Sequence, residues 1–208
     1  IADGEAVIGA AIGKLIEPEC EVVGIVEDGR TLIEAALRLC PDVIVLEVLL
    51  PHLNGVDVAR KLSKMLPDSK LLFLTAESSP IVAREAFQAG ASAYVLRRSL
   101  PSLLSLAIQA VRNGQQFVCP LMTKGLLAAG DNGDQGNDIK RCLSSLTPRQ
   151  REVLQLIAEG RGTKEVATVL NIAVKTVEFH KFKIMEQLDL HSTAALTRQA
   201  IAEGLVSL

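Results

Sequence analysis

Four polar side chains suited to phosphate or cation chemistry follow apolar segments in the first half of the sequence. Asp3 and Glu47 supply carboxylates, and Thr75 supplies a hydroxyl. Arg97 supplies a permanent positive charge with several N–H donors. In an open α/β sheet functional groups gather at the carboxyl ends of the strands, so we expect these side chains to lie together. Such a set could act on a phosphoester, or Glu47 and Arg97 could form a purely structural ion pair.

A small phosphatase-like site is the first function to weigh, and the sequence argues against it. No nucleophile with a paired base can be assembled, because the chain has only three histidines. His52 follows the predicted strand at 43–47, whereas His180 and His191 belong to the C-terminal part. There is no Gly-rich phosphate loop of the type GxxxxGK followed by Ser or Thr. We expect no enzyme and no cofactor, and turnover of a generic phosphoester would contradict this.

The elements that must position these side chains follow from the hydropathy pattern of the first half. Short apolar runs alternate with amphipathic stretches, as in βα units around a parallel sheet. VIVLE and LLFLT are continuous apolar runs, which is typical of strands covered on both faces. We predict strands at 21–26, 43–47, 71–75 and 93–96, and helices at 30–39, 56–66, 81–89 and 101–112. The opening IAD is interpreted as the end of a first strand. Counted with the βα unit that it opens, the pattern gives five strands and five helices of a doubly wound, flavodoxin-like α/β domain.

The composition changes between residues 119 and 144. The stretch AAGDNGDQGND contains three Gly, three Asp and two Asn with almost no apolar side chain. That composition is typical of a flexible linker. We therefore divide the chain into a domain at 1–118, a linker at 119–144 and a second domain at 145–208.

The second domain is predicted to be all-α, because LTPRQREVLQLIAEG resumes a helical periodicity. Thr147 and Pro148 provide an N-cap and a first-turn proline, and Gly160 ends this helix. Further helices are predicted at 163–170, 175–188 and 192–203, with Gly204 ending the last. Two short helices, a tight turn at NIAV and a longer helix form the layout of a helix-turn-helix, which places its last helix in the DNA major groove.

The predicted helix at 175–188 has two faces. One carries residues at spacings of three and four that should face the core: Val177, His180, Ile184 and Leu188. Donors to DNA phosphates are expected on the outer face and its flanks: Lys175, Thr176, Lys181 and Lys183. Glu178 is a candidate acceptor from a cytosine amino group, and Phe179 and Phe182 are candidates for contact with thymine methyls. Spacing and charge alone are equally compatible with an ordinary solvated helix face.

The net charge of −2 conceals an asymmetry between the two halves. Over 1–118 there are 11 Lys and Arg against 14 Asp and Glu, whereas over 145–208 there are eight against seven. The C-terminal part is therefore only slightly basic. Any DNA affinity must depend on where the basic side chains lie and not on their sum.

The cysteines and the lengths of the uncharged runs indicate the cellular compartment to expect. Four cysteines without CxxC pairing or a nearby His cluster argue against a metal site and suit reduced thiols: Cys20, Cys40, Cys119 and Cys142. A redox sensor built on Cys119 and Cys142 is an alternative. The longest uncharged run, 99–111, is shorter than the about 20 residues of a membrane span, and the first residues carry an acid where a signal peptide carries bases. We expect a cytoplasmic protein without a membrane partner.

LTPRQREVL, KEVA and VKTVEFH are the most specific stretches of the C-terminal domain. About 60 residues around them resemble the LuxR/FixJ/NarL helix-turn-helix over its whole length. The resemblance implies a homodimer on double-stranded DNA, commonly paired through the last helix, here 192–203. Lys175, Thr176 and His180 match the core of the family's VKTVxxH motif. The positions at which relatives contact bases hold Glu178, Phe179 and Phe182, where many members carry a basic residue.

The first domain resembles the receiver domain of two-component response regulators at IAD, PDVIVLEVLLPHLNG, LLFLTA and AGASAYVLRR. The resemblance implies a pocket in which two acids and an Asp at the third strand bind Mg²⁺. That Asp accepts a phosphoryl group, which a Thr or Ser and a Lys contact. Here Gly4 follows Asp3 where a second acid is usual, Glu47 stands at the acceptor position, and Arg97 stands at the Lys position. Two family positions are retained: the hydroxyl residue Thr75 and the switch aromatic Tyr94.

These differences predict a degenerate pocket that is not switched by conventional aspartyl phosphorylation. Glu47 extends its carboxylate by one methylene, roughly 1.3–1.5 Å, and a misplacement of about 1 Å can cost about 10²-fold in rate. Mg²⁺ needs near-ideal octahedral oxygen geometry, which the loss of an acid at Gly4 weakens. The planar fork of Arg97 can pair bidentately with Glu47.

Several alternatives stay open at this point. Glu47, with Arg97 and Thr75, could imitate the phosphorylated state, or the domain could be a dimerisation scaffold or take a different signal. A conventional phosphorylation-switched response regulator and a protein-interaction module without DNA binding are the competing functions. The dimer could pair through the fourth and fifth helices or through the C-terminal domain, and whether a sensor kinase acts on the protein stays open.

Overall fold

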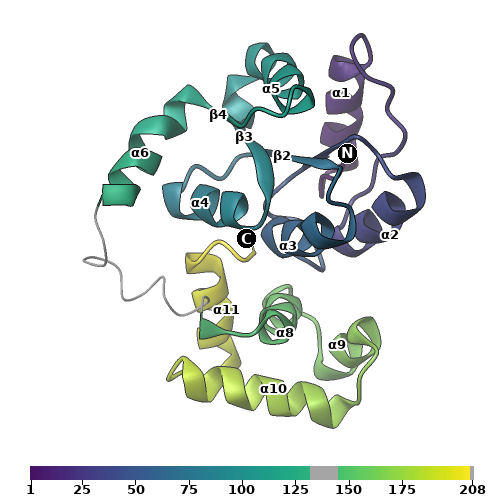
Figure 1. Ribbon diagram of the computed structural model, residues 1–208. Coiled ribbons are helices and arrows are strands. Elements are labelled where there is room, and N and C mark those ends of the chain that lie inside the picture. The colour runs from purple at the N-terminus through teal and green to yellow at the C-terminus, as the bar shows by residue number, and fades with distance from the viewer. Residues whose placement is uncertain (132–144, 207–208) are drawn as a thin grey trace. The chain divides into compact units, whose positions relative to one another are not determined.

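The computed structural model describes residues 1–131 and 145–206. The chain divides into two compact units, Ile1–Asp134 and Gln135–Leu208 (Figure 1). None of the helices within the described residues is long and apolar enough to cross a membrane.

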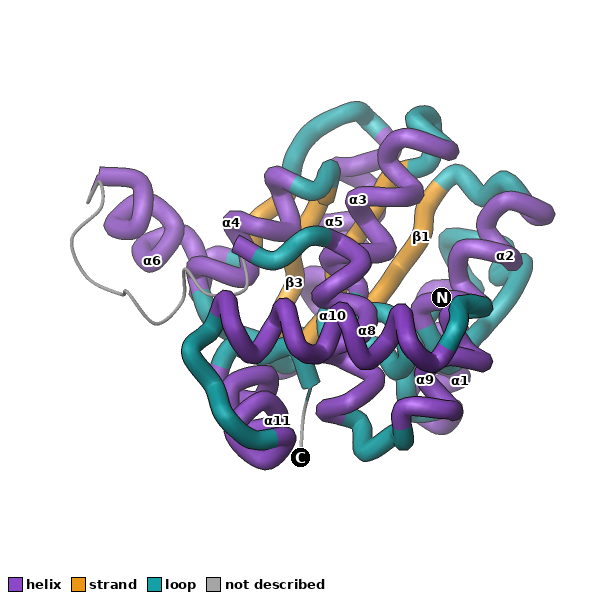
Figure 2. The backbone as a smooth tube through the Cα atoms, turned by 90° about the horizontal axis from the view of Figure 1, so that it is seen from below, coloured by secondary structure: helices purple, strands orange, loops and turns teal. Residues whose placement is uncertain are grey.

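A parallel sheet forms the centre of the N-terminal unit. Its strands are β1 (Val43–Leu46), β2 (Lys70–Thr75), β3 (Ala91–Leu96) and β4 (Phe117–Val118), hydrogen-bonded in the order β1-β2-β3-β4. The strands predicted at 43–47, 71–75 and 93–96 are therefore confirmed, whereas β4 was not predicted. Figure 2 shows the strands (orange) with helices around them.

The strand predicted at 21–26 is wrong. Only Val26 of this segment forms a β-bridge, and its partner is Ala2. On its other side Ala2 forms a bridge with Leu46 of β1. Few hydrogen bonds join the segment to its neighbour, among them those from Asp3 N–H to the Val26 carbonyl and from Val26 N–H to the Ile1 carbonyl. The apolar character of the segment is real, but its pairing with residues 1–3 is limited to this isolated bridge. The opening IAD likewise forms isolated bridges and no strand.

Helices cover both faces of this sheet (Figure 1). They are α1 (Ala6–Ile16), α2 (Gly29–Leu39), α3 (Gly55–Met65), α4 (Pro80–Gln88) and α5 (Ser102–Arg112). On one face Leu72 and Val95 pack with Ile12 of α1 and Ile108 of α5. On the other face the alternate strand residues pack with α2, α3 and α4, as Phe73 does in the larger core. Because successive strand side chains point to opposite faces, both clusters are apolar, and the doubly wound α/β fold is confirmed.

The interpretation of residues 119–144 as a linker is wrong for its first half. Helix α6 spans Pro120–Asp131, and it packs against α4. Met122 is buried in the core of the N-terminal unit, Leu126 packs against it, and Cys119 is fully buried. Residues 120–131 contain few charged side chains, and they end in the Gly- and Asp-rich run that suggested a linker. The remaining residues, 132–144 with Cys142, lie outside the described residues.

The C-terminal unit is all-α, as predicted. Its described helices are α8 (Pro148–Ala158), α9 (Thr163–Leu170), α10 (Val174–Gln187) and α11 (Thr193–Ala202). Thr147 and Gln150 form a reciprocal capping box at the start of α8, which satisfies two backbone N–H groups. Gly160, with a φ of 86°, follows the end of α8, and Asn171 ends α9 in the left-handed region. Val153, Leu156 and Val166 form part of a separate apolar core.

Candidate functional site

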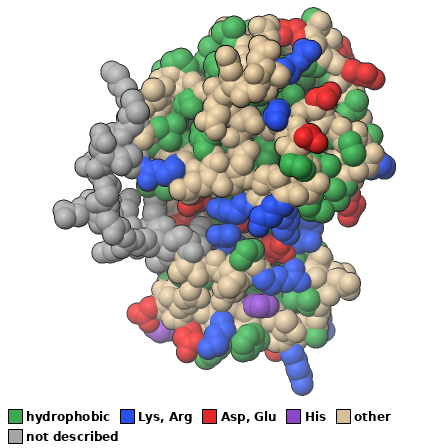
Figure 3. Space-filling view, viewed as in Figure 1, with side chains coloured by type: hydrophobic (Ala, Val, Ile, Leu, Met, Phe, Trp, Pro, Cys, Tyr) green, Lys and Arg blue, Asp and Glu red, His purple; other side chains and the backbone are tan. Residues whose placement is uncertain are grey.

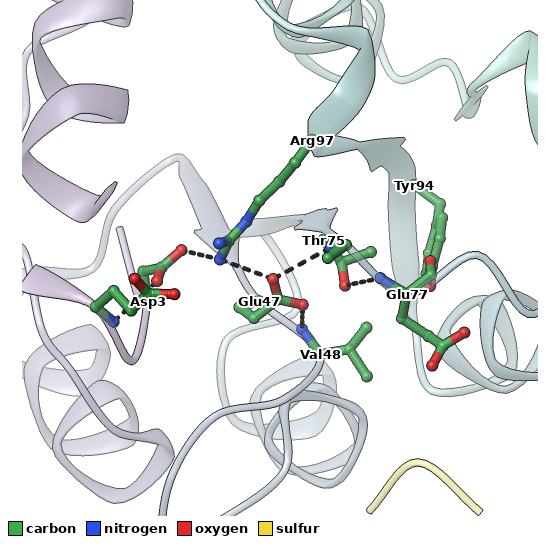
Figure 4. A network of polar contacts seen from close by, with 9 residues as sticks. Asp3, Glu47, Val48, Thr75, Glu77, Tyr94 and Arg97 are labelled. Carbon is green, nitrogen blue, oxygen red and sulfur yellow. Dashed lines mark hydrogen bonds and ion pairs between the residues drawn. The ribbon is translucent and has the colours of Figure 1, made fainter. Parts of the chain in front are cut away.

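The four polar side chains of the N-terminal unit meet at the carboxyl ends of the strands (Figure 4). Asp3 follows the bridging residue Ala2, and Glu47 follows β1 directly. Thr75 is the last residue of β2, and Arg97 follows β3 at the start of a single 3-10 turn, Arg97–Ser99. The two carboxylates and the hydroxyl are all buried, with exposed fractions of 2%, 6% and 0% for Asp3, Glu47 and Thr75.

Arg97 joins the two carboxylates. Its Nη2 atom contacts Asp3 Oδ2 and lies 2.7 Å from Glu47 Oε2. Glu47 is contacted through this one nitrogen, so the bidentate pairing that the planar fork of Arg97 allows is not the arrangement observed. The contact with Asp3 was not predicted, and it connects residues that lie 94 positions apart in the sequence.

Glu47 is held by backbone groups as well. The Val48 N–H donates to Oε1 at 2.6 Å, and the Ala76 N–H donates to Oε2 at 3.4 Å. Burial raises the pKa of Glu47, although a hydrogen bond from Thr75, the positive charge of Arg97 and the Val48 N–H oppose that shift. The carboxylate is thus fixed on both oxygens. These backbone donors carry no signal in the sequence, so sequence reasoning missed them.

Thr75 and Tyr94 are connected through the loop between β2 and α4. The Glu77 N–H donates to Thr75 Oγ1 at 3.0 Å, and the Tyr94 hydroxyl donates to the Glu77 carbonyl at 2.9 Å. Tyr94 is fully buried and stacked on Phe73, with 5.9 Å between ring centroids. Burial raises the pKa of Tyr94 well above its ordinary value, so the hydroxyl remains a donor. The pocket and Tyr94 therefore hold the same loop.

The second candidate site is the outer face of α10. Val177 and Ile184 are buried, whereas Phe179 and Phe182 are 58% and 62% exposed. His180, expected to face the core, is half-buried beside the Phe179 ring. The predicted division of the helix into two faces is therefore observed. On the surface of this unit, basic and hydrophobic side chains are both visible in Figure 3.

The polar residues of α10 differ in their exposure and in the side chains that they contact. Lys175 and Glu178 are exposed, and Thr176 is half-buried. The Lys181 ammonium donates to Thr193 Oγ1 of α11 at 2.7 Å. Lys183 pairs with Glu186 at 2.7 Å on the same helix, and its ammonium lies 5.9 Å from the centroid of the Phe182 ring. The structure thus leaves most of the predicted DNA-facing residues on the surface.

Both halves of the chain match family models. The response regulator receiver domain matches residues 1–109, and the model described as bacterial regulatory proteins, luxR family, matches residues 144–200. The chain belongs to the LuxR family of response regulators.

Relatives of this response regulator cover nearly its whole length. The oxygen regulatory protein NreC of Staphylococcus epidermidis is 32% identical over 212 residues, which is 99% of this chain and 97% of the relative. The transcriptional regulatory protein DegU of Brevibacillus brevis is 29% identical over 203 residues, 92% of this chain and 86% of the relative.

Solved structures agree with this assignment. A structure of the RcsB response regulator of Salmonella typhimurium, described in terms of its conformational dynamism for DNA interaction, matches with a TM-score of 0.58 and 25% identity. The match covers 97% of this chain and 96% of the RcsB chain. A LuxR-family response regulator from Aurantimonas matches with a TM-score of 0.60 and 25% identity over 63% of this chain and 95% of its own.

The pocket of this response regulator does not fit the Mg²⁺ that its family resemblance implies. The Arg97 guanidinium lies between Asp3 and Glu47 and neutralises the carboxylates that would hold the cation. No second acid is available at Gly4, and a Cβ there would lie 3.1 Å from Pro51 Cδ. Among the residues described, no group of three or more His, Cys, Asp or Glu side chains is placed to hold a metal ion. The cation that contacts these two carboxylates in this structure is the Arg97 guanidinium.

Proposed function

We propose that this protein is a DNA-binding transcription regulator whose receiver works without conventional phosphorylation of the acceptor position. One observation carries the receiver part of the proposal: Arg97 Nη2 contacts both Asp3 and Glu47. The phosphoryl chemistry of a receiver needs an attacking oxygen in line with the donor and a metal ion that neutralises charge. Here the guanidinium takes the place of the metal, and the Glu47 carboxylate is engaged on both oxygens.

The DNA-binding part rests on α10 and on the family. A helix-turn-helix presents its last helix to the major groove, and α10 presents Lys175, Lys183 and two phenylalanines on its outer face. The RcsB relative is described in terms of DNA interaction. We propose a homodimer on double-stranded DNA, because two copies of the helix would then meet the groove about one helical turn apart.

Phosphorylation is tested by incubating the purified protein with Mg²⁺ and either acetyl phosphate or beryllofluoride. Intact mass spectrometry should show no stable phosphoryl adduct, and a fluorescence titration should show no saturable beryllofluoride binding. The matched control is the variant Glu47→Asp with Arg97→Lys, which restores the usual residues at two positions and is expected to gain acceptor activity. A one-to-one adduct on the unaltered protein would overturn the proposal for the receiver.

Two explanations of the closed pocket predict different DNA affinities. If the network imitates the phosphorylated arrangement, Glu47→Ala should weaken DNA binding, because the loop at Ala76 loses its acceptor. If the receiver is only a scaffold, the same variant should bind DNA as the unaltered protein does. Genome-wide footprinting with the unaltered protein, Glu47→Asp and Glu47→Ala distinguishes them. Absence of any footprint would contradict the DNA-binding part.

A further inference from the structure

Two aromatic side chains of this chain lie in water on one face of one helix. Phe179 and Phe182 of α10 are 58% and 62% exposed. Among the residues that the structure describes, every other aromatic side chain is buried or half-buried. The chain has only five Phe and one Tyr, so a third of its aromatic residues stand outside a core. Three positions separate them on a helix, which places both rings on neighbouring turns of the same face.

Cations border these two rings. Lys183 lies over the Phe182 ring at 5.9 Å from its centroid, and Lys175 is exposed one turn before Phe179. A surface that combines apolar rings with lysines is complementary to a polyanion that also presents apolar groups. Duplex DNA meets that description in its major groove, where the C5-methyl group of thymine is the apolar feature of the base edges.

We infer that Phe179 and Phe182 give this regulator a preference for thymine by burying C5-methyl groups in the major groove. The inference rests on the proposed DNA-binding function and adds the chemical group that is read. The lysines contact phosphates and set the position of the helix, whereas the two rings discriminate between bases. Glu178, which directly precedes Phe179 in the sequence, is left to contact a base amino group.

The test exchanges thymine for uracil, because this removes only the methyl group. A random-sequence duplex library is enriched on the unaltered full chain, and the enriched pool is then amplified with either thymidine or deoxyuridine triphosphate. The dissociation constants of the two pools are compared by fluorescence anisotropy at low salt. Burial of one methyl-sized group corresponds to about fourfold in affinity, so the uracil pool should bind about 4- to 15-fold more weakly.

Variants assign the effect to the two rings. Phe179→Ala and Phe182→Ala should weaken binding of the thymine pool and leave the uracil pool nearly unchanged, so the ratio falls towards one. Lys175→Gln is the control, since it should weaken both pools equally and keep the ratio. Both rings are exposed, so thermal unfolding followed by circular dichroism should be unchanged in the phenylalanine variants.

The outcomes separate this inference from the function on which it rests. Equal binding of the two pools by the unaltered protein would overturn the methyl preference while DNA binding stands. A preference that survives in both phenylalanine variants would also overturn it, because another residue would then read the methyl. If neither pool binds at low salt, the proposed DNA-binding function itself fails.

Discussion

Arg97 occupies a position where two buried acids would otherwise repel each other. Asp3 and Glu47 are almost entirely buried, and each is paired with the same guanidinium nitrogen. Removing one partner of a buried ion pair leaves an uncompensated charge, which typically costs about 3–5 kcal/mol. The network also reaches Thr75 and the loop that follows it, through the Ala76 N–H.

We expect Arg97→Ala to lower the free energy of unfolding of the N-terminal unit by about 3 kcal/mol, because both carboxylates lose their cation. With the guanidinium gone, the two acids become available to a divalent ion. Millimolar Mg²⁺ should therefore raise the melting temperature of Arg97→Ala and leave that of the unaltered protein unchanged. Urea and thermal unfolding with and without Mg²⁺ measure both effects, and Arg98→Ala, next in the chain, is the control. Equal responses to Mg²⁺ in the two proteins would refute the substitution of one cation by another.

Glu47 makes the stability of this unit depend on pH. Its folded-state pKa is raised by burial above the unfolded value of 4.5, so the folded protein holds this proton more tightly than the unfolded chain. The resulting contribution to stability is complete below 4.5 and is lost as the pH rises through the folded value. Glu47→Gln cannot titrate, so its stability should fall less over the same range. Urea midpoints at several pH values from 4.5 upwards give the two profiles, and parallel profiles would contradict the predicted role of Glu47.

At the scale of elements, helix α6 extends the N-terminal unit beyond the five helices of its sheet. It packs against α4, and Gly125 faces Pro80, the first residue of α4. The same α4 begins at the end of the loop that Tyr94 and Thr75 hold. The pocket, the loop, α4 and α6 therefore form one continuous set of contacts.

The α4–α6 contact is tested by giving Gly125 a side chain. A Cβ there would lie 2.6 Å from Pro80 Cγ, which is too close without movement. An alanine normally stabilises a helix by about 0.5–1 kcal/mol relative to glycine. We expect Gly125→Ala to destabilise the unit instead, by about 1–3 kcal/mol, through overpacking. Gly13→Ala in α1 is the matched control, because its Cβ would meet Ile25 Cδ1 at 3.4 Å, an ordinary contact. Stabilisation by both alanines in urea unfolding would show that α6 does not pack as described.

The elements also show which features a sequence predicts. The strands with continuous apolar runs and the helix that Thr147 caps and Gly160 ends follow local rules, and all of them form as expected. Helix α6 was missed because a Gly- and Asp-rich run dominates the composition around it. That Arg97 and Asp3 lie close together follows from their places after strand ends, but their direct contact was not predicted, since no local pattern connects residues 94 positions apart. The backbone donors Val48 and Ala76 are invisible to reasoning about side chains.

At the scale of the whole molecule, the net charge does not indicate that the partner is DNA. The protein is acidic overall at −2, and the sequence from 145 onwards exceeds neutrality by one basic residue. Binding to a duplex must then come from few lysines in a favourable position. Lys183 is paired with Glu186, and Lys181 donates to Thr193, so both must exchange these partners for phosphates.

The salt dependence of DNA binding reports how many lysines contact phosphates. With three lysines of α10 per protomer and two protomers, the logarithm of affinity should fall with the logarithm of salt with a slope of about −5. Lys175→Gln should reduce that slope by about two in a dimer, because one contact is lost in each protomer. Lys64→Gln in α3 changes the charge equally and should leave the slope unchanged. Titrations of the enriched duplex pool between about 50 and 200 mM salt measure this slope, and a slope near zero would contradict the predicted phosphate contacts.

The positive charge that balances Asp3 and Glu47 belongs to the protein itself, because Arg97 is part of the same chain. Under the proposed function, such a regulator does not wait for a donor molecule or for a free ion. A cell could still adjust the number of copies of the protein, through transcription, translation and proteolysis. Output would then rise with the concentration of the protein.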